Sequence, residues 1–180
     1  MSVGIQQFRM DGRVALITGG SRGLGRSMAE GLASAGAQPI LVGRDHDIAH
    51  AAAEEISQQF DVEALALTAD VTDEKAVAGL VADAMAQKGR LDILINSAGI
   101  NIRGPIDELS LDDFQQVMQT NVTGTWLCCR EVVPIMKRAA WGRIINVAST
   151  LGLIGLSDRT PYTTSKGAVV QMTRALGLEL

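Results

Sequence analysis

Short apolar runs alternate with longer helical segments along the chain, and this alternation restricts the folds that the chain can adopt. The runs are almost continuously apolar, which is typical of strands buried on both faces of a parallel sheet. Strands that alternate with helices in this way predict right-handed βαβ crossovers and a doubly wound α/β fold. The expected strands cover residues 14–18, 39–43, 64–68, 91–96 and 143–147.

Capping and breaking residues indicate where the intervening helices begin and end. Gly36 is suited to end the first helix, and Pro161 is suited to the first turn of the last one. Thr72 and Ser110 each precede acidic residues, so both are expected to act as helix N-caps. The expected helices run from Gly23 to Gly36, over 47–60, from Thr72, from Ser110 to about Lys137, and from Pro161 to the end of the chain.

The composition favours small molecules or other protein chains as partners. Sixteen basic and twenty acidic side chains give a net charge of −4, so the chain lacks the basic surface that nucleic acids and anionic membranes require. The only cysteines, Cys128 and Cys129, are adjacent and match no zinc spacing, which favours a reducing cytoplasm. No run has the length of a signal peptide or of a membrane span. We expect a polar arm over residues 1–12 and one domain over 13–180.

The first expected strand runs directly into TGGSRGLGRS, residues 18–27. Glycines at such a turn let a phosphate approach the free N–H groups of the following helix. Three interpretations stay open: ordinary turn chemistry, a nucleoside-triphosphate loop and a dinucleotide site. The triphosphate loop needs lysine where Arg26 stands, and the common dinucleotide spacing G-x-G-x-x-G is absent. Thr18, Gly19, Gly23 and Gly25 instead have the spacing T-G-x-x-x-G-x-G.

Tyr162 is the only tyrosine of the chain, and Lys166 follows it by one helical turn. Residues four apart on a helix share a face, so the ammonium group is expected beside the phenol. A cation at that distance favours the phenolate and lowers the pKa of a phenol from its ordinary value of about 10. The pair therefore has the chemistry of a general acid and base, unless the two residues form an ordinary surface pair.

Together with four further motifs, these features resemble the short-chain dehydrogenase/reductase family over nearly the whole chain. Ser149 precedes Tyr162 by thirteen residues, which is the usual interval in that family. Ser97 departs from the pattern, because the family more often has a second asparagine there. Gluconate 5-dehydrogenase-like and 3-oxoacyl reductase-like members both look similar over this span. The matching segments are TGGSRGLG, Asp70 in ADVTD, Asn96–Gly99, Asn121 in QTNVTG, Ser149 in NVAST, and YTTSK.

The resemblance implies a Rossmann-type sheet with strand order 3-2-1-4-5, in a homo-oligomer that is expected to be a tetramer. Family members usually continue with two further strands and a loop that closes over the substrate. This chain ends at Leu180 within a helical run, so the last strands of the family fold are expected to be missing. An open sheet edge and an uncovered helix face would then make the isolated chain prone to aggregate.

The resemblance also implies roles for individual residues. Tyr162 would exchange a proton with the substrate oxygen, and Ser149 would hydrogen-bond the same oxygen. Lys166 would tune Tyr162 and hold the nicotinamide ribose, while Asn121 would anchor a water that relays the proton. The expected cofactor-binding residues are Thr18, Gly19, Ser21, Arg22, Gly23, Leu24, Gly25, Arg44, Asp70, Val71, Asn96, Ala98 and Gly99, with Tyr162 and Lys166.

The end of the second expected strand bears on the choice between NAD(H) and NADP(H). Gly43 stands where NAD-dependent relatives tend to carry an aspartate, and Arg44 follows it. Arg22, in the glycine turn, is a second guanidinium suited to a phosphate. We therefore expect a preference for NADP(H), with NAD(H) possible if Asp45 reads the ribose instead.

The sequence as a whole predicts an oxidoreductase that transfers hydride between NADP(H) and a secondary alcohol or ketone. The substrate would be a sugar acid, a polyol or a 3-oxoacyl thioester. The alternative is a dinucleotide-binding module without catalysis, acting as a sensor or a partner subunit. No metal site is expected, because His46 and His50 have metal-capable spacing but no further ligand is apparent.

Overall fold

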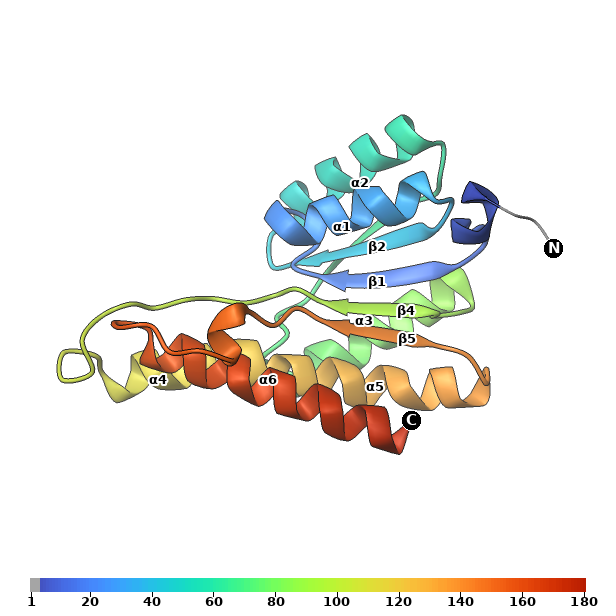
Figure 1. The fold of residues 1–180 in the computed structure, drawn as a ribbon. Coiled ribbons are helices and arrows are strands. Elements are labelled where there is room, and N and C mark those ends of the chain that lie inside the picture. The colour runs from blue at the N-terminus through green and yellow to red at the C-terminus, as the bar shows by residue number, and fades with distance from the viewer. Residues whose placement is uncertain (1–3) are drawn as a thin grey trace.

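A computed structural model describes residues 4–180 and contains one parallel sheet of five strands (Figure 1). The strand order is β3-β2-β1-β4-β5, which confirms the order expected from the resemblance. The order reverses between β1 and β4, so the two halves of the sheet wind in opposite directions from its centre. The strands are β1 (Val14–Thr18), β2 (Gln38–Gly43), β3 (Leu65–Thr68), β4 (Ile93–Asn96) and β5 (Arg143–Asn146).

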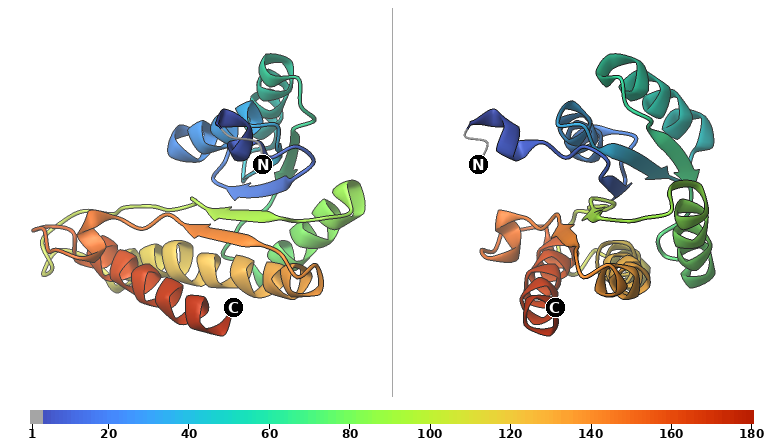
Figure 2. Two further views of the ribbon diagram at one scale, coloured as in Figure 1. Left: turned by 45° about the vertical axis from the view of Figure 1, so that its right-hand side comes forward. Right: turned by 90° about the vertical axis from the view of Figure 1, so that its right-hand side faces the viewer.

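Helices cover both faces of this sheet, as Figures 1 and 2 show. Alternate side chains of β1 enter two separate cores: Ala15 and Ile17 pack toward α1 and α2, whereas Val14 and Leu16 pack toward α3 and α5. This two-sided burial explains why the strands read as continuous apolar runs. The helices are α1 (Gly23–Ser34), α2 (His46–Phe60), α3 (Glu74–Lys88), α4 (Leu111–Met118), α5 (Gly124–Arg138) and α6 (Thr160–Glu179).

Three shorter helical turns complete the order of elements. The turns are η1 (Ile5–Phe8), the π-helical η2 (Gln119–Thr123) and η3 (Thr150–Gly152). Of the expected arm, residues 1–3 lie outside the described residues. The rest of the arm is fastened to the domain, because the amide of Met10 donates to the carbonyl of Ala35 at 2.7 Å.

The cap of α3 differs from the prediction. Asp73 is the N-cap, and its carboxylate accepts the N–H groups of Lys75 and Ala76 at 2.8 and 3.1 Å. The hydroxyl of Thr72 instead donates to Asp70 at 2.8 Å, and it is the Asp73 side chain that accepts the first N–H groups of α3. The prediction of Thr72 as the cap was therefore wrong by one residue. The side chain of Thr72 is oriented toward Asp70 and not toward the helix.

The long helical region that begins at Ser110 is interrupted. Ser110 does form the predicted cap, with a reciprocal capping box to Asp113. The π-helical η2 then separates α4 from α5, immediately before Gly124. A π segment inserts one extra residue per turn and often marks a functional site. Here it turns Asn121 inward, where only 1% of its surface is exposed.

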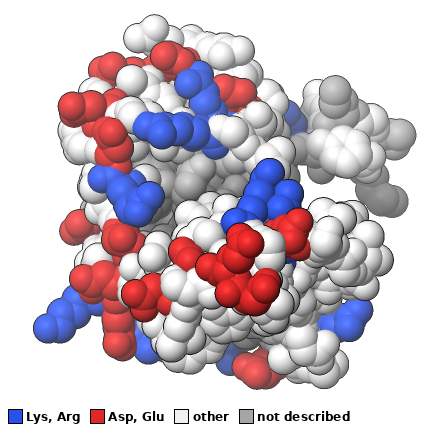
Figure 3. Space-filling model, turned by 90° about the vertical axis from the view of Figure 1, so that its left-hand side faces the viewer, with Lys and Arg blue, Asp and Glu red and all other residues white. Residues whose placement is uncertain are grey.

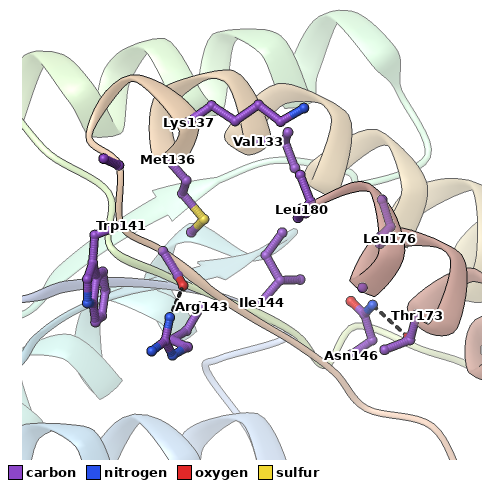
Figure 4. Close-up of a pocket in the computed structure, with 13 residues that line it drawn as sticks. Val133, Met136, Lys137, Trp141, Arg143, Ile144, Asn146, Thr173, Leu176 and Leu180 are labelled. Atoms are coloured by element: carbon purple, nitrogen blue, oxygen red, sulfur yellow. Dashed lines mark hydrogen bonds between the residues drawn. The ribbon is translucent and has the colours of Figure 1, made fainter.

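β5 forms the open edge of the sheet, since it pairs only with β4. Its residue Ile145 is 47% exposed. A groove of about 600 Å³ lies beside the strand, between the C-terminal parts of α5 and α6 (Figure 4). Apolar side chains that line it include Met136, Trp141, Ile144, Leu176 and Leu180. The open edge and the uncovered helix face that the sequence predicted are both present.

Asp92 ties together the amino ends of β1 and β4. Its carboxylate accepts bonds from Arg90 at 2.6 and 2.7 Å, from Arg13 at 2.8 Å and from the amide of Val14 at 2.9 Å. Only 5% of the residue is exposed. Burial by itself would raise the pKa of Asp92, but the bonds from Arg90, Val14 and Arg13 outweigh it and lower that pKa below the ordinary 3.8.

We expect Asp92→Asn to lower the free energy of unfolding by about 2 kcal/mol near neutral pH, because the bonds to charged groups are lost. A lowered carboxyl pKa stabilises the fold above about pH 4, and that contribution disappears as the pH falls through the folded-state pKa. The difference between wild type and variant should therefore shrink below pH 4. Urea unfolding at several pH values tests this, with the exposed Asp83→Asn as control. A difference independent of pH would contradict it.

Gly25 is required by the close packing of the turn after β1. A methyl group at Gly25 would overlap the carbonyl oxygen of Gly19 and crowd Gly20. Gly31 lies on the same helix, α1, but has no atom near the position that a methyl group would take. Close packing therefore requires glycine at position 25 but not at position 31.

Gly25→Ala should lower the free energy of unfolding by at least about 2 kcal/mol, because the backbone has to move apart. The matched control Gly31→Ala should raise it by about 0.5–1 kcal/mol, since alanine favours the helix. Urea unfolding of both variants measures the contrast. Equal stability of the two variants would show that the turn tolerates a side chain.

Candidate active site

A cleft of about 730 Å³ opens at the carboxyl ends of the strands, where the strand order reverses. In doubly wound sheets this is the position at which ligands bind. Figure 3 shows the face concerned, with basic side chains at the rim of a hollow. The cleft lies between the glycine turn after β1 on one side and the segments after β2, β3 and β4 on the other.

The glycine turn has the geometry of an anion site. Gly19 has a φ of +65°, and a side chain there would lie 3.0 Å from the backbone of Ala98. α1 begins at Gly23 without a side-chain cap and without an acidic residue in its first turn. Its free N–H groups and positive dipole end therefore remain available to a phosphate. Ser21 and Arg22 line the cleft beside this helix end.

Charged residues after β2 and β3 form the opposite rim. Arg44 and Asp70 both line the cleft. A bond from the amide of Thr72 at 2.9 Å lowers the pKa of Asp70, burial opposes this, and the charge of Arg44 lowers it further. Asp45 caps α2 by accepting the amide of Ile48 at 3.2 Å, so its carboxylate already has a structural role.

Arg26 does not line this cleft. Its guanidinium pairs with Glu30 at 2.9 Å and also with Glu55, and both bonds raise its pKa. The residue that replaces the lysine of a triphosphate loop is thus held by two carboxylates on α1 and α2.

Lys166 lies on the first turns of α6, next to the phenol of Tyr162. Its ammonium is 5.7 Å from the centre of the tyrosine ring and donates to the carbonyl of Val147 at 2.6 Å. The residue is only 7% exposed, and this burial lowers the pKa of its ammonium. Among residues 4–180 no carboxylate pairs with it. A buried, uncompensated cation therefore adjoins the only tyrosine.

Ser149 follows β5 and caps the short turn η3. Its hydroxyl oxygen accepts the amide of Leu151 at 3.1 Å, which leaves the hydroxyl proton free to be donated. The residue is half-buried. The chain thus reaches α6 from the end of β5 through a segment that begins with a potential hydrogen-bond donor.

The side-chain amide of Asn121 forms hydrogen bonds with other protein groups. Its Oδ1 accepts the amide of Ile100 at 2.8 Å, and its Nδ2 donates to the carbonyl of Ile100 and to the hydroxyl of Ser165, each at 2.9 Å. Both N–H bonds of the amide are used. The side chain therefore has no free N–H for the water that the family resemblance implies, and its contact with such a water would have to be made through the second lone pair of Oδ1.

The expected cofactor-binding residues fall into two groups. Eight line the cleft, and they are Gly19, Ser21, Arg22, Arg44, Asp70, Val71, Ala98 and Gly99. The others lie behind it or beside it. Thr18 is buried and accepts the amides of Ser97 and Ala98 at 3.2 Å, and Asn96 donates to Asn146 at 2.9 Å. Gly23, Leu24, Gly25, Tyr162 and Lys166 are also outside the lining.

Gly99 connects the cleft with the tyrosine and lysine. It lines the cleft, and a side chain on it would lie 3.2 Å from Oδ1 of Asn121 and 3.8 Å from the ammonium of Lys166. The glycine turn and the tyrosine–lysine pair therefore adjoin one cleft, although they are more than a hundred residues apart in sequence.

Several residues of the site were not predicted from the sequence. Gln116, Gln119 and Thr120 line the cleft from α4 and η2. No local motif marks them, because only the path of the helices beneath the carboxyl ends of the strands brings them there. Ser165 was also missed, although it lies between Tyr162 and Lys166 in the YTTSK segment.

The remaining candidate features have structural explanations. His46 and His50 are exposed, with stacked rings 5.7 Å apart. No group of three or more His, Cys, Asp or Glu residues within the described part of the chain could hold a metal ion. Burial raises the pKa of Cys128 to about 12 and that of Cys129 to about 11, so neither thiol is reactive at neutral pH. No helix between residues 4 and 180 is both long enough and apolar enough to span a membrane.

Known proteins resemble the chain in both sequence and structure. A 3-oxoacyl-[acyl-carrier-protein] reductase from Aquifex aeolicus is 34% identical over 174 residues, which cover 97% of this chain and 70% of that protein. A gluconate 5-dehydrogenase from Burkholderia cenocepacia, crystallised with NADP and tartrate, superposes with a TM-score of 0.92 at 33% identity, covering 97% of this chain and 68% of that one. An NAD⁺-bound xylitol dehydrogenase superposes with a TM-score of 0.91 at 33% identity, covering 94% and 65%.

The chain thus spans about two thirds of the length of the relatives that it matches. The family model for short chain dehydrogenases matches residues 13–180, which include the glycine turn and the tyrosine–lysine pair. With the sheet order, the cleft at its switch point and these matches, the chain belongs to the short-chain dehydrogenase family of NAD(P)-dependent oxidoreductases.

Proposed function

We propose that the protein interconverts a secondary alcohol and a ketone, prefers NADP(H), and uses Tyr162 as general acid and base. The observation that carries this proposal is the buried ammonium of Lys166 beside the ring of Tyr162, next to a cleft with an anion site. A cation that lacks a carboxylate partner can stabilise a phenolate instead. Residues 13–180 would form the cofactor-binding catalytic domain, and residues 1–12 an arm.

Each polar group then has a distinct task. When bound, the nicotinamide cofactor supplies or accepts the hydride. Tyr162 donates its proton to the carbonyl oxygen in reduction and takes it back in oxidation. Ser149 donates its free hydroxyl proton to the same oxygen, which stabilises the charge that develops there. Lys166 favours the phenolate and has further N–H groups for a ribose hydroxyl, since Val147 accepts only one of them.

The cleft itself suits a dinucleotide. The helix end at Gly23, with Ser21 and Arg22, would hold the pyrophosphate. Asp70, Val71, Ala98 and Gly99 would contact the adenine and ribose. The pairing of Arg26 with Glu30 and Glu55 argues against a triphosphate site.

Arg22 and Arg44 support the preference for NADP(H). Both line the cleft near the end of β2, where the adenosine ribose binds in dinucleotide folds. Asp45, the alternative reader of a free 2′-hydroxyl, already caps α2. The relatives include an NADP complex and an NAD⁺ complex, so the preference rests on these side chains.

The substrate classes that we propose are sugar acids, polyols and 3-oxoacyl thioesters, in line with the names of the relatives. We further propose a cytoplasmic homotetramer. A panel of carbonyl compounds, tested with the protein from its complete reading frame, would identify the class. Cofactor binding without turnover of any compound would favour the alternative, a dinucleotide-binding sensor or partner subunit.

Tyr162→Phe should lower kcat by at least about 100-fold, because the proton donor is lost. The Kd for NADPH should change by less than about twofold, since a phenyl ring keeps the shape of the residue. Steady-state rates and fluorescence titration of NADPH measure the two quantities. A variant that keeps more than half of the wild-type kcat would refute Tyr162 as the acid.

NADPH should bind at least about tenfold more tightly than NADH in a direct titration, because a guanidinium adds a charge-assisted bond to the 2′-phosphate. Arg44→Ser should remove most of that advantage and leave the Kd for NADH unchanged. Arg138→Gln, which removes an exposed arginine at the end of α5, is the control. Equal affinities of the wild type for the two cofactors would refute the preference.

A further inference from the structure

Ser165 is a completely buried polar residue on the active-site helix, and the proposed chemistry gives it no task. It is 0% exposed. Its hydroxyl oxygen lies 2.9 Å from Nδ2 of Asn121 and 2.8 Å from the carbonyl oxygen of Tyr162. A buried hydroxyl with two partners at such distances is fixed in one orientation.

The directions of these hydrogen bonds follow from the chemistry of the partners. Oδ1 of Asn121 accepts the amide of Ile100, so the nitrogen of the side chain must face Ser165 and donate to it. The carbonyl of Tyr162 can only accept, so the hydroxyl of Ser165 must donate to it. A single chain of donors therefore runs from Ile100 through Asn121 and Ser165 to the backbone of Tyr162.

This chain of bonds joins three segments that are distant in sequence. Ile100 follows β4 and lines the cleft, Asn121 lies in η2, and Ser165 lies in α6. Ser165 is also the residue immediately before Lys166. The bonds therefore fix the first turns of α6, from which both the phenol and the ammonium project, against the floor of the cleft.

We propose that Ser165 is a positioning residue, which works with Asn121 to hold the ammonium of Lys166 beside the phenol of Tyr162. The proposal rests on the proposed function and explains why both N–H groups of the Asn121 side chain bind protein partners. Without the hydroxyl, Asn121 keeps a buried N–H without an acceptor, and α6 can shift to satisfy it. Displacements of about 1 Å at a catalytic group are enough to cost about 100-fold in rate.

α6 contains an internal control for the proposal. The hydroxyl of Thr173 accepts from Nδ2 of Asn146 at 2.9 Å and donates to the carbonyl of Val169 at 2.7 Å. This is the same bonding pattern, roughly two helical turns beyond Ser165 and away from Tyr162, but Thr173 is exposed whereas Ser165 is buried. Loss of a hydroxyl bridge can thus be compared at two positions of one helix.

The test compares Ser165→Ala with Thr173→Ala in the complete protein. Ser165→Ala should lower kcat by about tenfold or more, with the KM for NADPH changed by less than about twofold, because the loss concerns orientation at the reacting atoms. Thr173→Ala should change neither constant by more than about twofold. Equal effects of the two variants on kcat would overturn the proposal.

A second readout needs no turnover. Since Tyr162 is the only tyrosine, the absorbance of phenolate against pH reports its ionisation alone. Ser165→Ala should move the midpoint of that titration upward by about half a pH unit or more, because the ammonium lies farther from the phenol. Thr173→Ala should leave it unmoved. An unmoved midpoint in Ser165→Ala would overturn the proposal.

The outcomes separate the two proposals. Wild-type protein without activity toward any carbonyl compound would refute the proposed function, whereas the titration would still decide the role of Ser165. Full activity of Ser165→Ala would refute the role of Ser165 alone. If Ser165→Ala does not fold, Ser165→Cys replaces it, because a thiol has a similar shape and forms only weak hydrogen bonds. Wild-type kcat and midpoint in that variant would likewise overturn the proposal.

Discussion

The site depends on a backbone-to-backbone contact at the centre of the sheet, between the turn after β1 and the loop after β4. Gly19 lies so close to Ala98 that a side chain would meet its backbone at 3.0 Å, and Thr18 binds the amides of Ser97 and Ala98. Because this contact joins the two halves of the sheet at the switch point, it also sets the floor of the cleft. The helix end of α1 and the loop that carries Gly99 are positioned by it.

The second constraint is the burial of the charged side chain of Lys166. Lys166 is buried, its ammonium donates to one carbonyl, and within residues 4–180 no carboxylate pairs with it. Such an arrangement costs stability, and burial accordingly lowers the pKa of the ammonium. In an acid–base site this cost has a use, because an uncompensated cation can interact with a phenolate. The network of Ile100, Asn121 and Ser165 gives the same helix the rigidity that this arrangement requires.

The outer edge of the molecule differs from its centre. β5 has an open edge, Ile145 is half exposed, and an apolar groove lies between α5 and α6 (Figure 4). At the amino end of the same strand, the guanidinium groups of Arg13 and Arg143 lie 3.7 and 5.1 Å from the centre of the Trp141 ring. The cleft end of the sheet is thus joined by hydrogen bonds between distant segments, while the flank at β5 presents apolar surface.

The sequence by itself determined the fold class and the elements on which the site is built, because continuous apolar runs, glycine turns and helix caps are local signals. The strand order was expected only from the resemblance to a known family, since strand order depends on which distant segments pair. The sequence did not predict which of several neighbouring polar residues forms a given hydrogen bond. Thr72 was expected to cap α3, but it hydrogen-bonds to Asp70, and Asp73 is the cap. Only the tertiary structure decided that both N–H groups of the Asn121 side chain bind Ile100 and Ser165, and that Gln116, Gln119 and Thr120 reach the cleft. Such contacts join segments distant in sequence, so no local pattern specifies them, and they depend on how the helices pack against the sheet.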